Sequence, residues 1–155
     1  MEFTGQFTTQ TSTETAAKKL TDIRCISQCL PTLSKLEIVN DEEFLATFKV
    51  DLTDAASKIH LDYLSRLTVR MHFKYLEKTI DTIVLEGTGR TAGSKLTLTL
   101  RLSISEGKDG SIIAWKAEAE FGRFLKLFGE KLVRDVSGGI ISDLTECLSV
   151  KLASA

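Results

Sequence analysis

The chain has 155 residues, a net charge of −1 at pH 7 and 26% charged residues, so no strong overall field favours nucleic acid or anionic lipid. Hydrophobic residues make up 43% of the chain, which is enough for a core, and the length fits one domain over residues 1–155. No apolar run approaches the roughly 20 residues that a membrane-spanning helix needs, and the first residues lack a signal-peptide pattern. We therefore expect a cytoplasmic protein with no nucleic-acid partner.

The three cysteines fit that compartment. Cys25 and Cys29 are four residues apart, and Cys147 is distant from both. An odd number of cysteines without a C-x-x-C spacing is not typical of a disulfide framework or a zinc site. We expect three reduced thiols that pack as small hydrophobic side chains.

The N-terminal part of the chain predicts one strand followed by two short helices. The alternation in "MEFTGQF" predicts a strand over residues 2–10. Ser12 or Thr13 is a suitable N-cap for the first helix, and Asp22 is a suitable N-cap for the second. Pro31, the only proline, marks the end of the second helix.

The middle of the chain alternates apolar and polar residues, which is the pattern of half-buried strands. The strands follow a turn at residues 40–42, and "EGKDGS" predicts a hairpin turn between the last two. Each strand has one apolar and one polar face, which predicts an antiparallel sheet with one face packed on a core. The alternating stretches are residues 44–52, 67–75, 96–104 and 113–121, with a shorter apolar run around residues 83–85.

A C-terminal helix from about residue 123 to 152 is the only predicted element long enough to cover that apolar face. Gly138 and Gly139 lie in its middle, where a glycine costs roughly 0.5–1 kcal/mol relative to alanine. The apolar stripes before and after this pair are rotated by roughly 100° from each other. We expect a kink or a π-bulge at the pair; a close helix–sheet contact without a bend is the alternative.

The pattern resembles the carbon monoxide dehydrogenase G-subunit family of the helix-grip (START/Bet v 1-like, SRPBCC) superfamily. The likeness covers the whole chain in order and spacing. Thr32 is a departure, because the family often has glycine there. The matching pieces are the opening "MEFTGQF", Cys29–Pro31, Glu86–Gly93, Trp115, and the helix that follows Gly122 and Gly129.

The resemblance implies an α+β helix-grip fold, in which a curved antiparallel sheet wraps around a long C-terminal helix, with two short helices after the first strand. It also implies an apolar cavity that opens near the short helices. The expected partner is a hydrophobic small molecule such as a lipid or a quinone, and no cofactor is expected. The family implies an accessory or membrane-recruitment role for a carbon monoxide dehydrogenase or molybdenum hydroxylase complex, with peripheral contact at the inner face of the cell membrane.

The candidate site is the set of apolar residues on the inner face of the sheet and on the helix. A filled core is the alternative, since cavities and cores use the same side chains. Ile26, Leu30 and Leu33 are the expected entrance, on short helices able to move and to touch a membrane. The expected ligand-binding residues are Leu67, Val69, Met71, Phe73, Leu98, Leu100, Trp115, Phe128, Leu132, Val136 and Ile140.

Two further motifs favour ordinary structural roles. "GTGRTAG" has strands on both sides, so it lacks the helix of a phosphate-binding loop, and its glycines predict a turn or a bulge. His72 alternates onto the polar face, and with His60 it offers no convergent metal ligands. The acidic residues 41–43 are expected in a solvated loop.

A helix-grip enzyme of the cyclase or dehydratase type is the rival interpretation, and a ligand-free protein-interaction module is a third. An enzyme needs an acid–base group in the pocket, and Tyr75 is the main candidate, with Tyr63 as another. No catalytic residue is assigned. Arg90, Arg101 and Arg123 are candidates to orient a polar ligand head, although surface ion pairs explain them equally well.

Overall fold

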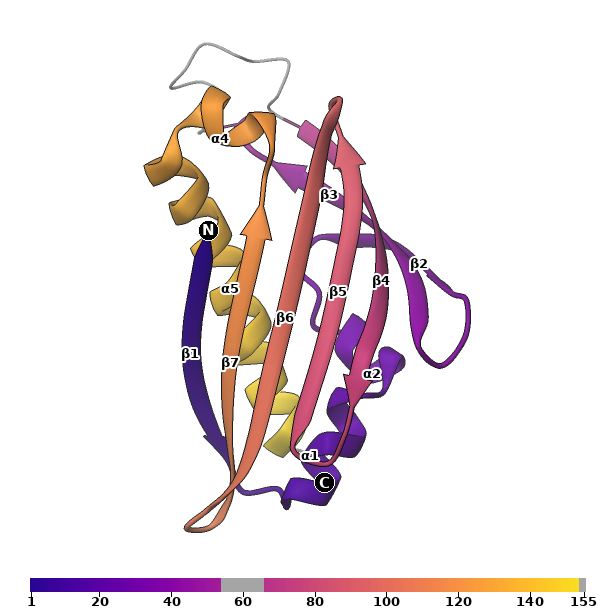
Figure 1. Cartoon of the computed structure of the whole chain (residues 1–155), viewed down its shortest axis with the longest axis vertical. Helices are drawn as coiled ribbons and strands as arrows, with labels where there is room; N and C mark the ends of the chain where they lie inside the picture. The colour runs from indigo at the N-terminus through magenta and orange to yellow at the C-terminus, as the bar shows by residue number, and fades with distance from the viewer. Residues whose placement is uncertain (54–65, 154–155) are drawn as a thin grey trace.

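The computed structural model describes residues 1–53 and 66–153. One seven-stranded sheet and several helices make up this part of the chain (Figure 1). In chain order the elements are β1 (Glu2–Thr9), α1 (Thr13–Leu20), α2 (Ile23–Ser27), β2 (Leu33–Ile38), β3 (Glu43–Asp51), β4 (Arg66–Lys78), β5 (Thr82–Thr91), β6 (Ser94–Gly107), β7 (Gly110–Glu120), α4 (Arg123–Phe128) and α5 (Glu130–Ala153).

The sheet is antiparallel, with the strand order β1-β7-β6-β5-β4-β3-β2. It curves around α5, which lies along its inner face (Figure 1). This arrangement confirms the predicted helix-grip fold. The strand β2 was not predicted, because its buried positions do not alternate and it pairs with β3 alone, at the edge of the sheet.

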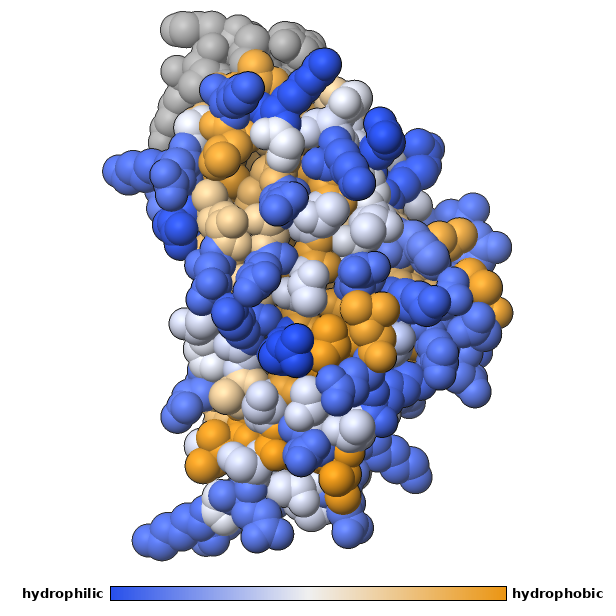
Figure 2. All heavy atoms as spheres, viewed as in Figure 1, coloured by the Kyte–Doolittle hydropathy of each residue, from blue (hydrophilic) through white to orange (hydrophobic). Residues whose placement is uncertain are grey.

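The outer side of the molecule is mainly hydrophilic. Figure 2 shows polar and charged residues over most of the visible face, with smaller apolar patches among them. One patch lies on the β2–β3 hairpin, where Ile38, Val39 and Leu45 are exposed. Within the described ranges, no helix combines the length and the apolar character that crossing a bilayer requires.

Both short helices begin at the predicted caps. The Ser12 hydroxyl accepts a hydrogen bond from the Thr15 backbone N–H at 3.3 Å. The Asp22 carboxylate accepts one from the Arg24 N–H at 3.0 Å. These bonds satisfy N–H groups that have no partner within the first turn of a helix.

The predicted long C-terminal helix is confirmed as α5, but its predicted start at about residue 123 is wrong, because Arg123–Phe128 form the separate helix α4. Gly129 separates them with a φ of 84°, a left-handed backbone conformation that favours glycine. In contrast, α5 continues as an α-helix through Gly138 and Gly139, so the predicted π-bulge at this pair does not occur.

The break at Gly129 accounts for part of the rotation between the two apolar stripes. Phe124 and Phe128, at the start of the first stripe, belong to the separate helix α4. Within α5, Val136, Ile140, Leu144 and Leu148 follow one another at four-residue spacing and line the same cavity. The alternative of a close contact is also wrong, since a Cβ atom at either glycine of the pair would have no neighbour within 4 Å.

The glycines of "GTGRTAG" have two different roles. Gly87 and Gly89 lie inside β5 and not in a turn or a bulge, contrary to the prediction. A Cβ on Gly89 would lie 2.2 Å from the Arg70 carbonyl oxygen of β4, so glycine is required there by a close approach. The turn itself comes at Ala92 and Gly93, which both have positive φ.

Thr32, the residue that departs from the family pattern, has a φ of 62°. Glycine adopts this conformation without the steric cost that a β-branched residue has. The Thr32 carbonyl accepts a hydrogen bond from the Lys49 N–H of β3 at 3.1 Å. The chain therefore retains, with threonine, the turn geometry for which glycine is the usual residue.

Candidate ligand-binding site

A cavity of about 300 Å³ lies between the inner face of the sheet and α5. Its wall comes mainly from β3, β4, β5, β6, α4 and α5 and is almost entirely apolar. The polar residues at its border are Thr32, Thr91, Thr97, Glu120 and Ser137. Its volume is at the lower end of the range of about 300–1,000 Å³ that is typical of small-molecule pockets.

The structure brings most of the predicted site residues together. Alternation along β4 and β6 places their apolar residues on the inner face, opposite the stripe of α5. Phe3, Leu52 and Leu144 also line the cavity and were missed. The predicted residues that line it are Leu67, Val69, Met71, Phe73, Leu98, Leu100, Phe128, Leu132, Val136 and Ile140.

Trp115 does not line the cavity. Its ring lies over Gly5 of the neighbouring strand β1, where a Cβ would meet the ring at 2.4 Å. The missing side chain of Gly5 therefore provides the space for the indole, which packs against the main core. Sequence alternation indicated the face on which Trp115 lies but not the direction of its ring.

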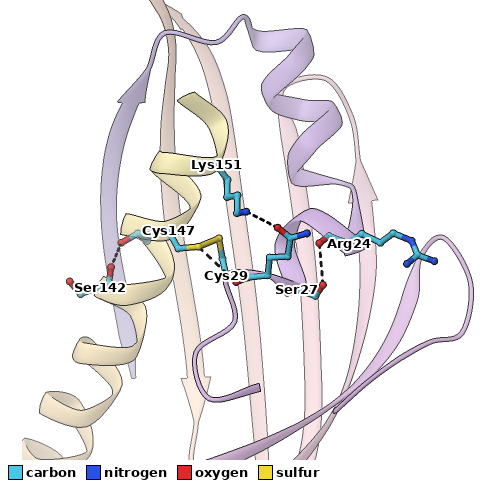
Figure 3. Close-up of a disulfide and its surroundings, with 8 residues drawn as sticks. Arg24, Ser27, Cys29, Ser142, Cys147 and Lys151 are labelled. Atoms are coloured by element: carbon cyan, nitrogen blue, oxygen red, sulfur yellow. Dashed lines mark hydrogen bonds between the residues drawn. A yellow bond between two sulfur atoms is a disulfide. The ribbon is translucent and has the colours of Figure 1, made fainter. Parts of the chain in front are cut away.

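The predicted entrance forms one end of the cavity, which we call the α2 end. Ile26 and Leu30 line the cavity there, whereas Leu33 belongs to β2 and packs against the core. Cys29, between them in the chain, forms a disulfide with Cys147 of α5, with a Cα–Cα distance of 5.4 Å (Figure 3). The entrance is therefore bonded covalently to α5 rather than free to move.

The disulfide corrects the expectation of three reduced thiols. The two cysteines are 118 residues apart in sequence, and only the packing of α2 against α5 brings them together. Cys25 is the free cysteine, and burial raises the pKa of its thiol. The cysteines consequently no longer support a reducing compartment.

Polar contacts reinforce the α2 end. Lys151 of α5 donates to the Gln28 side-chain oxygen at 2.6 Å, and Lys19 of α1 donates to the Lys151 carbonyl at 3.1 Å. The Thr11 hydroxyl donates to the Leu152 carbonyl. The bonds from Lys19 and Thr11 satisfy carbonyls in the last turn of α5, which lack partners within the helix.

Tyr75 is buried but does not line the cavity. Its hydroxyl donates a hydrogen bond to the Leu20 carbonyl at 2.9 Å, and burial strongly raises its pKa. The hydroxyl thus holds α1 on the sheet and does not face a ligand. Tyr63 and His60 lie outside the described residues.

The remaining polar candidates lie away from the cavity. His72 is exposed on β4 and forms a 2.9 Å hydrogen bond with Glu43, which lowers the pKa of that carboxyl. Arg90 and Arg101 are exposed on β5 and β6. Within residues 1–53 and 66–153, no cluster of His, Cys, Asp and Glu is arranged to bind a metal.

A second depression, of about 730 Å³, lies at the opposite end of the cavity, which we call the α4 end. We call this depression the basic groove, because Arg66, Arg123 and Lys126 line it. It shares three lining residues with the apolar cavity, so the two adjoin. The sequence suggested Arg123 alone, since the approach of α4 to the start of β4 is not visible in local patterns.

The antiparallel sheet, the long helix and the apolar cavity between them define a helix-grip protein of the START/Bet v 1-like class. The family model of the carbon monoxide dehydrogenase G subunit (CoxG) matches residues 5–153, and the chain belongs to this family. No curated protein matches it in sequence.

Solved structures agree with this fold. A conserved protein from Geobacillus kaustophilus is 15% identical, with a TM-score of 0.81, covering 99% of this chain and 95% of the other. A START superfamily protein from Mycobacterium smegmatis is 13% identical, with a TM-score of 0.68, covering 97% and 96%. The protein Ara h 8.0201 is 14% identical, with a TM-score of 0.61, covering 99% of each chain.

Proposed function

We propose that this protein binds a hydrophobic small molecule, a lipid or a quinone, in the cavity between the sheet and α5. The apolar lining of that cavity carries the proposal. Water in a buried site needs two to four polar partners, and the wall offers few. Burial of an apolar ligand contributes roughly 25 cal/mol per Å² before the costs of binding.

The role that fits this binding is that of an accessory or membrane-recruitment factor for a carbon monoxide dehydrogenase or molybdenum hydroxylase complex. Membership of the CoxG family supports it. In this role the protein is in peripheral contact with a membrane; the Cys29–Cys147 disulfide does not support the cytoplasmic location expected from the sequence. Molybdenum hydroxylase genes beside the gene for this chain would support the same role.

A membrane contact through the predicted entrance does not fit the packing. Ile26 is buried, and Leu30 and Leu33 are half-buried against the core. Exposed apolar residues lie elsewhere on the molecule: Leu125 and Leu127 of α4 are 41% and 42% exposed, and the β2–β3 hairpin carries the exposed patch described above. A peripheral contact would therefore use one of these surfaces and not the α2 end.

Native mass spectrometry of the purified full chain, followed by organic extraction, tests ligand binding. We expect a bound species whose extra mass is recovered as lipid or quinone in the extract. Val136→Phe places a ring in the cavity and should lower the occupancy. Val150→Phe makes the same change on the same helix, at a residue that is 64% exposed and outside the cavity lining, and should leave occupancy unchanged.

Two results would contradict the proposal. One is equal occupancy in the chain with Val136→Phe and in the unchanged protein. The other is a purified chain that carries no extractable ligand and takes up neither added phospholipid nor added quinone. Thermal unfolding of both variants shows whether the larger side chain has altered the fold instead.

A further inference from the structure

The basic groove adjoins the apolar cavity at the α4 end. Leu67 of β4, Thr91 at the end of β5 and Phe124 of α4 border both depressions. A molecule that occupies the cavity and extends past these residues enters the groove. The two depressions together therefore form one site with an apolar part and a charged part.

The three cations of the groove come from two elements that are far apart in sequence. Arg66 begins β4, whereas Arg123 and Lys126 lie on α4. Ser94 fixes the start of α4, because its hydroxyl accepts from the Arg123 N–H at 2.9 Å and donates to the Phe121 carbonyl at 3.1 Å. Since Ser94 is buried, this attachment places the basic residues of α4 beside β4.

Among the described residues, the groove has an excess of positive charge. The ion pairs formed among the described residues include none of its three cations. Asp51 pairs with Arg66 in the register of β3 and β4; hydrogen bonds from Thr53 lower the pKa of Asp51, and Arg66 lowers it further by a smaller amount. Glu120 borders the cavity on β7. Asp51 offsets part of the charge of Arg66, whereas the charges of Arg123 and Lys126 are not offset by it.

An apolar ligand with an ionised head group matches this combination. The cavity wall has few hydrogen-bonding groups, so burying a charge in it would cost several kcal/mol. The head group must therefore lie outside the wall, where arginine and lysine can form charge-assisted hydrogen bonds with a carboxylate or a phosphate. The groove provides these donors directly at the mouth of the cavity.

We infer that the ligand is an anionic amphiphile, whose apolar tail lies in the cavity and whose carboxylate or phosphate head is bound by Arg66, Arg123 and Lys126. This inference rests on the proposed function and narrows its ligand class. It distinguishes a fatty acid or an acidic phospholipid from a neutral lipid or a quinone. It also assigns the α4 end as the side at which the head group meets solvent.

The test compares two probes with the same tail, decanoate and decanol, on the delipidated full chain by isothermal titration calorimetry at neutral pH. We expect decanoate to bind about tenfold more tightly than decanol, which corresponds to about one strong interaction. Combining Arg123→Gln with Lys126→Gln should remove this preference and leave decanol binding unchanged. Combining Arg101→Gln with Lys108→Gln removes the same charge at exposed residues outside both depressions and should preserve the preference.

The outcomes separate the inference from the proposed function. If both probes bind equally to the unchanged chain, or if the groove variant keeps the preference, the head-group assignment is wrong and the apolar cavity stands. If neither probe binds, the proposed function fails as well. If inorganic phosphate or acetate binds as tightly as decanoate, the groove is a site for free anions, and the amphiphile is excluded.

Discussion

The α2 end and the α4 end of the cavity differ in how they are held together. Figure 1 places α1 and α2 at the end of the sheet opposite α4. At the α2 end, a disulfide and several hydrogen bonds connect α5 to the N-terminal helices. At the α4 end, Gly122 and Gly129 bracket a six-residue helix with positive φ values, and a small separate core cluster supports it.

This difference shows how one fold can keep a cavity without collapsing around it. The large core, including Leu20, Phe44 and Leu152, is concentrated toward the α2 end and fixes α5 against the sheet. The α4 end has the basic groove and exposed leucines, which are poor contributors to stability. The α2 end thus provides most of the stability, and the α4 end provides the access to solvent.

Removing the disulfide should have the largest effect on the stability of the α2 end, and so on the contrast between the two ends. Combining Cys29→Ala with Cys147→Ala should lower the free energy of unfolding by about 4 kcal/mol, because the bond closes a loop of more than one hundred residues in the unfolded chain. Denaturant unfolding measures the change, and addition of a reductant to the unchanged protein should reproduce it. Cys25→Ala, at the free cysteine, is the matched control and should cost much less. Equal stability of all three chains would show that the α2 end does not depend on the bond.

Replacing Tyr75 should lower the free energy of unfolding by a smaller amount at the same end, and this loss should depend on pH. Tyr75→Phe leaves the Leu20 carbonyl without its partner and should cost about 1–3 kcal/mol. Burial raises the pKa of Tyr75 in the folded state, so the folded chain retains the proton when the unfolded chain loses it. This contribution is complete below about pH 10, the ordinary tyrosine pKa, and declines as pH rises toward the raised value.

Urea unfolding at several pH values between neutral and alkaline measures both the loss of stability in Tyr75→Phe and its dependence on pH. The difference in stability between the unchanged protein and the Tyr75→Phe variant should be constant near neutral pH and shrink in alkali. Because lysines titrate in both chains, only this difference isolates the tyrosine. A difference that stays constant through the alkaline range would contradict the role assigned to burial.

The sequence correctly predicted the features that are determined by residues close together in the chain. The Ser12 and Asp22 caps, the alternation of β3, β4, β6 and β7, and the hairpin at residues 107–110 follow from short stretches of sequence. The resemblance to a family supplied the topology. The apolar part of the candidate site followed from the same alternation, because a residue's place in a strand decides which face it occupies.

The features that were not predicted depend on contacts between distant segments. Cys29 meets Cys147 only after α2 packs on α5. The basic groove needs α4 beside the start of β4, and the direction of Trp115 depends on the missing side chain of Gly5. The break at Gly129 was assigned to the wrong glycines, because a rotated apolar stripe does not reveal where the helix ends.

Gly138 and Gly139 lie between the two ends. Replacing either should have the smallest predicted effect on the free energy of unfolding, and it should stabilise the protein, not destabilise it. Both lie inside the continuous helix α5, and added Cβ atoms would have no neighbour within 4 Å. Gly→Ala at either position should therefore raise the free energy of unfolding by roughly 0.5–1 kcal/mol, because alanine loses less conformational entropy in a helix. Gly89→Ala is the control in a strand, where the new methyl group would meet the Arg70 carbonyl, and it should destabilise. Denaturant unfolding of the three variants checks the signs, and a loss of stability at Gly138 or Gly139 would show that α5 needs its glycines for a packing contact this structure does not contain.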